Sequence, residues 1–207
     1  KGKAANRKAL CAEFGLNKIT GPLGIVVSRL TEQKGIDLLC QTAPDFIAQG
    51  GGLAVLGSGA PELEEQLKDL AKAHPGKIGL RIGYDEALSH RMFAGGDAVL
   101  VPSRFEPCGL TQLYGLRFGT VPVVAATGGL ADTVIDANPM ALADKVATGI
   151  QFHPIDGLGL GQALRRLVTL FAAKSQFTLM QKRGMTQTLG WDNSSAKYVE
   201  IYESLSA

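Results

Sequence analysis

Asp97-Ala98-Val99-Leu100-Val101-Pro102-Ser103-Arg104-Phe105-Glu106-Pro107-Cys108-Gly109-Leu110-Thr111 is the most informative stretch of the sequence. It begins with an apolar run of strand length, and a helical pattern follows it. We therefore expect a strand, a tight turn that carries the carboxylate of Glu106, and then a helix. In open α/β sheets ligands bind at such turns, and the first amides of the helix can hold an anion. A carboxylate beside an anion site suits a ligand with a hydroxylated part and a phosphate part, and a nucleotide sugar has this form.

Short apolar runs alternate with amphipathic helices along the rest of the chain. The runs expected to form strands are Leu23–Ser28, Leu53–Leu56, Ile78–Ile82, Val99–Val101, Val121–Ala125 and Thr148–Phe152. The helices between them include Lys34–Gln49 and Glu86–Ala94. Strands that are apolar on both faces and separated by helices form a parallel sheet covered on both sides. The sequence thus predicts a Rossmann-like α/β fold, a parallel six-stranded sheet with helices on both faces and the strand-to-helix loops on one edge.

Composition limits the class of protein. A chain of 207 residues with a formal net charge of +2 has no basic stripe, so we expect no nucleic-acid partner. It carries no secretion signal and no apolar run of membrane length, so we expect no membrane partner. Its cysteines and its histidines are too dispersed for a metal site, so we expect no metal and no cofactor. Sparse cysteines fit a reducing compartment such as the cytosol, which favours a cytoplasmic location.

The domain organisation is expected to be simple. Residues 1–207 are predicted to form a single domain, and its first residue, Lys1, lies on a helical pattern instead of a core strand. We therefore expect the chain to be an excerpt of a longer protein. A closing helix is predicted over residues 191–207.

Two strand-to-helix loops carry side chains suited to a nucleotide. Arg29 and Lys34 follow the first strand, where two cations could neutralise a diphosphate, although a solvated surface pair has the same pattern. Tyr84 follows the third strand, where its ring could stack on a nucleobase or take part in ordinary packing. Asp85 is better explained as the N-cap of the next helix.

Glycines mark two further loops. Gly57-Ser58-Gly59 resembles part of a dinucleotide fingerprint, but Glu62 replaces its third glycine, so we interpret it as a tight turn. Gly128 and Gly129 precede a short predicted helix, and such a pair allows close approach to a ligand or simply a sharp turn.

Four segments together carry a family resemblance. They are Ser28-Arg29-Leu30-Thr31-x-Gln33-Lys34-Gly35, Tyr84-x-Glu86-x-Leu88, the stretch from Pro102 to Tyr114, and Thr127-Gly128-Gly129-Leu130-x-Asp132-Thr133. In this order they closely resemble the bacterial glycogen synthases and plant starch synthases, specifically the carboxy-terminal, nucleotide-sugar-binding half of these B-type (GT-B) glycosyltransferases. The resemblance runs from about Leu23 to the end of the chain.

The resemblance implies transfer of glucose from ADP-glucose to the non-reducing end of an α-1,4-glucan, with retention of configuration and without a metal. It assigns Arg29 and Lys34 to the diphosphate and Tyr84 to the adenine. Glu106 resembles the essential carboxylate near the glucose. The remaining substrate contacts it implies are Cys108 and Gly109 to glucose and the Leu110 and Thr111 amides to phosphate, with Gly128 and Gly129 as further substrate-binding positions. Glu106 could bind sugar hydroxyls or stabilise oxocarbenium character, and a covalent nucleophile is the less favoured role.

Position 114 departs from the wider retaining class, in which many members have a second glutamate there. Tyr114 is shared with the glycogen and starch synthases and narrows the resemblance to them. The amino-terminal half of such enzymes, which holds most of the acceptor site, is absent from these residues. We therefore expect the chain alone to bind nucleotide weakly and to transfer no glucose, and we expect its closing helix to pack on the absent half.

Three alternatives stay open at this point. One is a transferase with another donor or acceptor, and another is a non-catalytic nucleotide-sugar-binding module. A dinucleotide-dependent dehydrogenase is the most distant, because no GxGxxG motif opens the first strand-helix unit.

Overall fold

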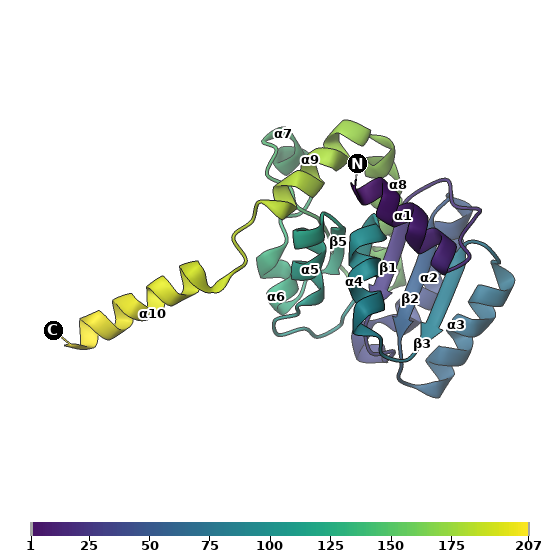
Figure 1. The fold of residues 1–207 in the computed structure, drawn as a ribbon, viewed down its shortest axis with the longest axis horizontal. Helices are drawn as coiled ribbons and strands as arrows, with labels where there is room; N and C mark the ends of the chain where they lie inside the picture. The colour runs from purple at the N-terminus through teal and green to yellow at the C-terminus, as the bar shows by residue number, and fades with distance from the viewer. Residues whose placement is uncertain (1, 207) are drawn as a thin grey trace.

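A computed structural model of the chain describes residues 2–206 and contains one parallel sheet (Figure 1). Its strand order is β3-β2-β1-β4-β5-β6, and every neighbouring pair is parallel. The strands are β1 (Leu23–Val27), β2 (Gly52–Gly57), β3 (Ile78–Ile82), β4 (Ala98–Val101), β5 (Val121–Ala125) and β6 (Ile150–Phe152). The predicted parallel six-stranded α/β fold is therefore confirmed.

Helices cover both faces of the sheet. They are α1 (Gly2–Glu13), α2 (Ile36–Ala48), α3 (Pro61–Ala73), α4 (Glu86–Gly95), α5 (Thr111–Phe118), α6 (Gly128–Thr133), α7 (Pro139–Ala143), α8 (Gly157–Ala172), α9 (Lys174–Met185) and α10 (Trp191–Ser206). Side chains alternate along each strand, so the sheet separates two apolar cores. In β1, Val26 packs with Phe46 of α2 and Leu164 of α8, whereas Ile25 packs with Met92 of α4.

Two element boundaries differ from the predictions by two residues, the others differ by at most one, and one helix was not predicted. The helix expected from Lys34 begins instead at Ile36, after a 3-10 turn over Glu32–Lys34 and a left-handed Gly35 with φ of 68°. Strand β6 begins at Ile150 instead of Thr148, because the Thr148 hydroxyl accepts a hydrogen bond from the Ile135 amide at 2.8 Å. The short helix α7 was not predicted.

Helix α1 is anchored through two cations. The Lys3 ammonium donates to the carbonyls of Phe93 at 3.0 Å and Phe118 at 3.3 Å, where α4 and α5 end. Burial lowers the pKa of Lys3 to about 8, although the nearby Asp97 carboxylate opposes this shift. Arg7 pairs with Asp97 at 2.8 Å, and Asp97 also accepts from the first amide of β1. These bonds fix α1 against the sheet.

Helix α10 projects away from the rest of the molecule (Figure 1). Apolar side chains are exposed along it, with Trp191 at 76% and Leu205 at 79%. A helix is therefore present where the closing helix was predicted, although residue 207 lies outside the described residues. The packing of this helix on a further domain stays a prediction. Within residues 2–206 no helix has the length and apolar character needed to cross a bilayer.

Candidate functional site

The strand order reverses between β1 and β4, because the chain continues from β1 to one side of the sheet and from β4 to the other. At such a point the loops that leave two neighbouring strands diverge, and ligands bind in the crevice between them. Here the loops after β1 and β4 enclose a small cleft of about 20 Å³. Lys34 lines it from one loop, and Ser103, Glu106 and Gly109 line it from the other.

Lys34 and Glu106 form an ion pair in this cleft. The Lys34 ammonium donates to Oε2 of Glu106, although the residues are 72 positions apart in the sequence. Their side chains are 19% and 11% exposed, so the pair is largely shielded from solvent. The Ser103 hydroxyl donates to the same carboxylate oxygen at 3.3 Å. Two of the three predicted catalytic residues are thus in direct contact.

Arg29, the third predicted catalytic residue, lies beside this pair on the loop after β1. It is exposed and is not among the residues that line the cleft. Its guanidinium donates to Gln33 at 3.4 Å, and the Gln33 amide donates to the Phe105 carbonyl at 3.3 Å. Arg29 is therefore linked to the β4 loop through Gln33 while its charge remains open to solvent.

Arg104 joins the two loops, a role that the sequence did not suggest. Its guanidinium forms a bidentate pair with Asp37 at 2.7 and 2.6 Å, and it also donates to the Glu32 carbonyl at 2.6 Å. Its backbone amide donates to the Gln33 carbonyl at 2.9 Å. The hydrogen bond from Arg104 lowers the pKa of Asp37 below its ordinary value. This clamp holds Lys34 opposite Glu106.

The turn from Cys108 to Thr111 leads into α5. Gly109 adopts a left-handed conformation with φ of 71°, and Thr111 is the first helical residue. Gly109 and Thr111 line the cleft, whereas Cys108 and Leu110 are exposed. The first amides of a helix have no partner within it and carry its positive dipole end, so this turn can hold an anion.

Gly128 and Gly129 lie against the same turn. A Cβ atom on Gly128 would be 2.3 Å from the Glu106 carbonyl oxygen, and one on Gly129 would be 2.5 Å from that of Cys108. The Gly129 amide also donates to the Glu106 carbonyl at 3.1 Å. The close approach that these glycines allow is thus to the chain itself, and their contact with a substrate stays a prediction. The expectation that they precede the helix is wrong, since α6 begins at Gly128.

The predicted adenine contact lies farther along the same edge of the sheet. Tyr84 follows β3, two strands from β1, and is 87% exposed. Asp85 caps α4 as predicted and accepts from the Leu88 amide at 2.8 Å. Tyr114 packs on α4, with its ring centroid 5.6 Å from that of Phe93. The structure therefore places Tyr84 at the carboxyl edge but outside the lining of the cleft.

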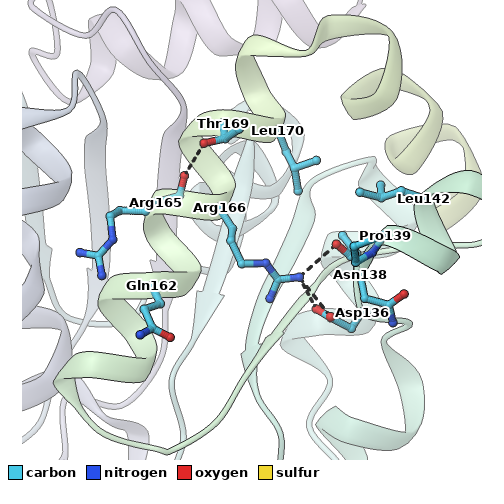
Figure 2. A pocket seen from close by; sticks show the side chains of 10 residues that line it. Asp136, Asn138, Pro139, Leu142, Gln162, Arg165, Arg166, Thr169 and Leu170 are labelled. Carbon is cyan, nitrogen blue, oxygen red and sulfur yellow. Dashed lines mark hydrogen bonds and ion pairs between the residues drawn. The ribbon is translucent and has the colours of Figure 1, made fainter.

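A larger cavity of about 670 Å³ lies between α8 and the segment before α7 (Figure 2). Its central cation, Arg166, is already engaged with Asp136 at 2.9 Å and with the carbonyls of Ala137 and Gln151, both at 3.1 Å. These bonds fix the loop to α8, so the cavity is not our candidate site. Within the described residues no group of His, Cys, Asp and Glu side chains could hold a metal ion.

The fold and the cleft define a class of protein, a Rossmann-like α/β domain with a cleft where its strand order reverses. Residues 14–154 match the family model described as glycosyl transferases group 1. The chain belongs to this family.

Similar proteins narrow the comparison. A glycogen synthase of Jannaschia sp. is 60% identical over 204 residues, covering 99% of this chain and 43% of that protein. A glycogen synthase of Cereibacter sphaeroides is 57% identical over 207 residues and is also covered to 43%. The chain thus spans less than half of these relatives. The predicted resemblance to the glycogen and starch synthases is confirmed.

Solved structures agree on the fold. The catalytic domain of starch synthase IV from Arabidopsis thaliana, bound to ADP and acarbose, superimposes with a TM-score of 0.88 at 31% identity, covering 99% of this chain and 43% of that one. The C-terminal domain of a group 1 glycosyl transferase from Francisella tularensis superimposes with a TM-score of 0.69 at 16% identity, covering 89% of this chain and 90% of that one. The expected carboxy-terminal half of a B-type glycosyltransferase is therefore confirmed as the fold.

Proposed function

We propose that this chain is the donor-binding half of a retaining glucosyltransferase that moves glucose from ADP-glucose to the non-reducing end of an α-1,4-glucan. The observation that carries the proposal is the contact between Lys34 and Glu106, which joins a cation and a carboxylate in one cleft. Relatives named glycogen synthase, 57–60% identical over the whole chain, support this choice of reaction. The starch synthase structure bound to ADP and acarbose supports an adenine nucleotide and a glucan as ligands.

The geometry suits a diphosphate that leaves with the help of fixed charges. Lys34 lies in the cleft and Arg29 at its border, and the amides of Leu110 and Thr111 lie at the start of α5. Positioned charges and amide dipoles of this kind stabilise the charge that develops on a leaving group. In this proposal Lys34 and these amides bind the diphosphate, and Arg29 turns toward it.

The two ends of the donor are assigned by position. Neighbouring strands lie about 4.8 Å apart, so Tyr84 at the end of β3 is on the order of 10 Å from the end of β1. A ribose and an adenine can span this distance, which supports stacking of the adenine on the exposed Tyr84 ring. Glu106 faces the glucose together with Cys108 and Gly109, and it binds sugar hydroxyls or stabilises oxocarbenium character.

Other parts of the proposal concern the whole enzyme. We assign most of the α-1,4-glucan acceptor site to residues outside this chain, and we place the enzyme in the bacterial cytoplasm. The chain alone is expected to bind nucleotide weakly and to transfer no glucose. Glucan elongation by the purified 207-residue chain would contradict this expectation.

Calorimetric titration of the chain with ADP, ADP-glucose and UDP-glucose tests the donor assignment. We expect the adenine nucleotides to bind more tightly than UDP-glucose. Lys34→Ala should weaken ADP binding by roughly tenfold to a hundredfold, the usual effect of losing a charge-assisted hydrogen bond. Lys68→Ala is the matched control, because Lys68 forms an exposed ion pair with Glu65 on α3. Equal effects of the two substitutions would contradict the proposal.

Activity of the full-length protein separates the proposal from a non-catalytic binding module. We expect Glu106→Ala to abolish glucose transfer while ADP still binds. Unchanged turnover in this variant would favour the binding module instead.

A further inference from the structure

Gln112 is a fully buried glutamine in the wall of the cleft. Its side-chain nitrogen donates to the carbonyls of Cys108 at 3.0 Å and Gly109 at 2.9 Å, and it lies 3.2 Å from the Thr133 hydroxyl. Its side-chain oxygen has no hydrogen-bond partner among the described residues. A buried acceptor without a partner is unfavourable, so the bonds made by the nitrogen determine how this amide is oriented.

The orientation of Gln112 controls two peptide groups. A trans peptide is planar, and its carbonyl and N–H point in opposite directions. Because Gln112 draws the carbonyls of Cys108 and Gly109 toward itself, the N–H groups of Gly109 and Leu110 point away from it. Among the described residues these two N–H groups donate to no backbone acceptor. They are therefore left as open donors beside the start of α5.

We propose that Gln112 is a positioning residue that presets the N–H groups of Gly109 and Leu110 for the phosphates of the donor, with Gly109 meeting both the phosphate that carries the glucose and the glucose itself. This inference rests on the proposed function. It assigns the buried Gln112 side chain an indirect part in diphosphate binding, through the two N–H groups that it positions.

The packing around Gly109 supports this role. Gly109 has φ of 71°, and a Cβ atom there would lie 2.6 Å from the open oxygen of Gln112 and 3.1 Å from Cγ of Glu106. The turn is thus enclosed between the glutamine and the catalytic carboxylate. A change in the Gln112 amide therefore reaches the phosphate donors through the turn, and the sugar side through Glu106.

Gln151 provides a matched control on β6. Its side-chain nitrogen also donates to two backbone carbonyls, those of Ala131 and Val134. It does not line the cleft. Gln112→Met and Gln151→Met therefore remove the same type of hydrogen bonds and keep a side chain of similar size, but only the first alters the turn before α5.

The test is titration of the wild-type chain and both variants with ADP and with adenosine, together with their melting temperatures. We expect Gln112→Met to lose roughly tenfold to a hundredfold in ADP affinity and to bind adenosine unchanged. Gln151→Met should bind both ligands as the wild type does, even if both variants melt earlier. Equal losses for ADP and adenosine, or equal losses in both variants, would overturn the inference. Failure of the wild-type chain to bind ADP would instead overturn the proposed function, and this inference with it.

A second measurement does not depend on any variant. In NMR titrations of the wild-type chain with ADP, the amide signals of Gly109 and Leu110 should shift, and adenosine should not shift them. The Gly161 amide, inside α8, is the internal control. Unchanged Gly109 and Leu110 signals at saturating ADP would overturn the inference, and with it the assignment of the Leu110 amide to the diphosphate, while the proposed donor and reaction would stand.

Discussion

Lys34 and Glu106 form an ion pair across the cleft, so each charge has a partner of the opposite sign. Their proposed roles are different, since Lys34 binds the diphosphate and Glu106 faces the glucose. Donor binding therefore exchanges one partner for another, and the phosphate competes with Glu106 for the Lys34 ammonium. This competition has a measurable consequence.

Glu106→Gln is expected to raise the affinity for ADP several-fold, because Lys34 no longer has an anionic partner in the cleft. In the full-length enzyme the same change should lower turnover roughly a hundredfold to a thousandfold, as expected for loss of a positioned charge. Calorimetry with ADP and initial rates with ADP-glucose measure the two effects. A loss of ADP affinity as large as that of Lys34→Ala would contradict the exchange of partners.

Gly35→Ala should separate the two loops that hold the ion pair. A Cβ atom on Gly35 would lie 2.0 Å from the Pro102 carbonyl oxygen, so the loop after β4 would have to move. Gly15→Ala is the control, since Gly15 has φ of 67° and open space around its Cβ position. Both variants lose about 1 kcal/mol to backbone strain, and Gly35→Ala should lose more stability and its ADP binding. Chemical denaturation and calorimetry measure this difference, and equal stability losses would contradict it.

The Arg104–Asp37 clamp predicts a pH dependence of stability at low pH. The pKa of Asp37 is lowered in the folded chain by the hydrogen bond from Arg104. Its stabilising effect is therefore present above the unfolded pKa of about 3.9 and is lost as the pH falls through the folded value. We expect wild type and Asp37→Asn to differ by roughly 1 kcal/mol at neutral pH, since both side chains are partly exposed, and to converge as the pH falls below the lowered pKa of Asp37. Urea denaturation across this range gives the comparison, and a constant difference would contradict it.

Lys3 predicts the same trend at high pH. Burial lowers its pKa from 10.5 to about 8, so the unfolded chain binds this proton more tightly than the folded chain. Between these values the free energy of unfolding of the wild type should rise with pH relative to Lys3→Met, by up to about 1.4 kcal/mol per pH unit. Lys8→Met, an exposed change in the same helix, should keep the wild-type profile. Parallel profiles of wild type and Lys3→Met in denaturation experiments would contradict the prediction.

Much of the fold could be predicted from apolar runs, because strands buried on both faces are marked by the sequence itself. β3 and β5 have the predicted limits. The boundaries that differ depend on contacts distant in sequence. At Gly35 the left-handed turn leaves no room for a Cβ beside the Pro102 carbonyl, and just before β6 the Thr148 hydroxyl bonds to the Ile135 amide. Helix α7 has only five residues, too few for a periodic pattern.

The site was predictable in its residue types but not in its contacts. The loops after β1 and β4 could be assigned to one edge because parallel strands direct all such loops there. The sequence does not reveal that Lys34 pairs with Glu106, or that Arg104 holds Asp37, because these residues are brought together by strand order. Gln112 was missed for a related reason. It lies within the recognised segment, but its polar side chain at the start of a helix gives no sign of burial.

The Arg104–Asp37 clamp has a consequence for the thermodynamics of ligand binding. The two loops are already fixed to each other before a nucleotide arrives, so binding has little backbone conformational entropy to remove. The proposed donor should therefore bind with little conformational change in these two loops. A large loss of conformational entropy during turnover would then have to come from parts of the protein other than these two loops.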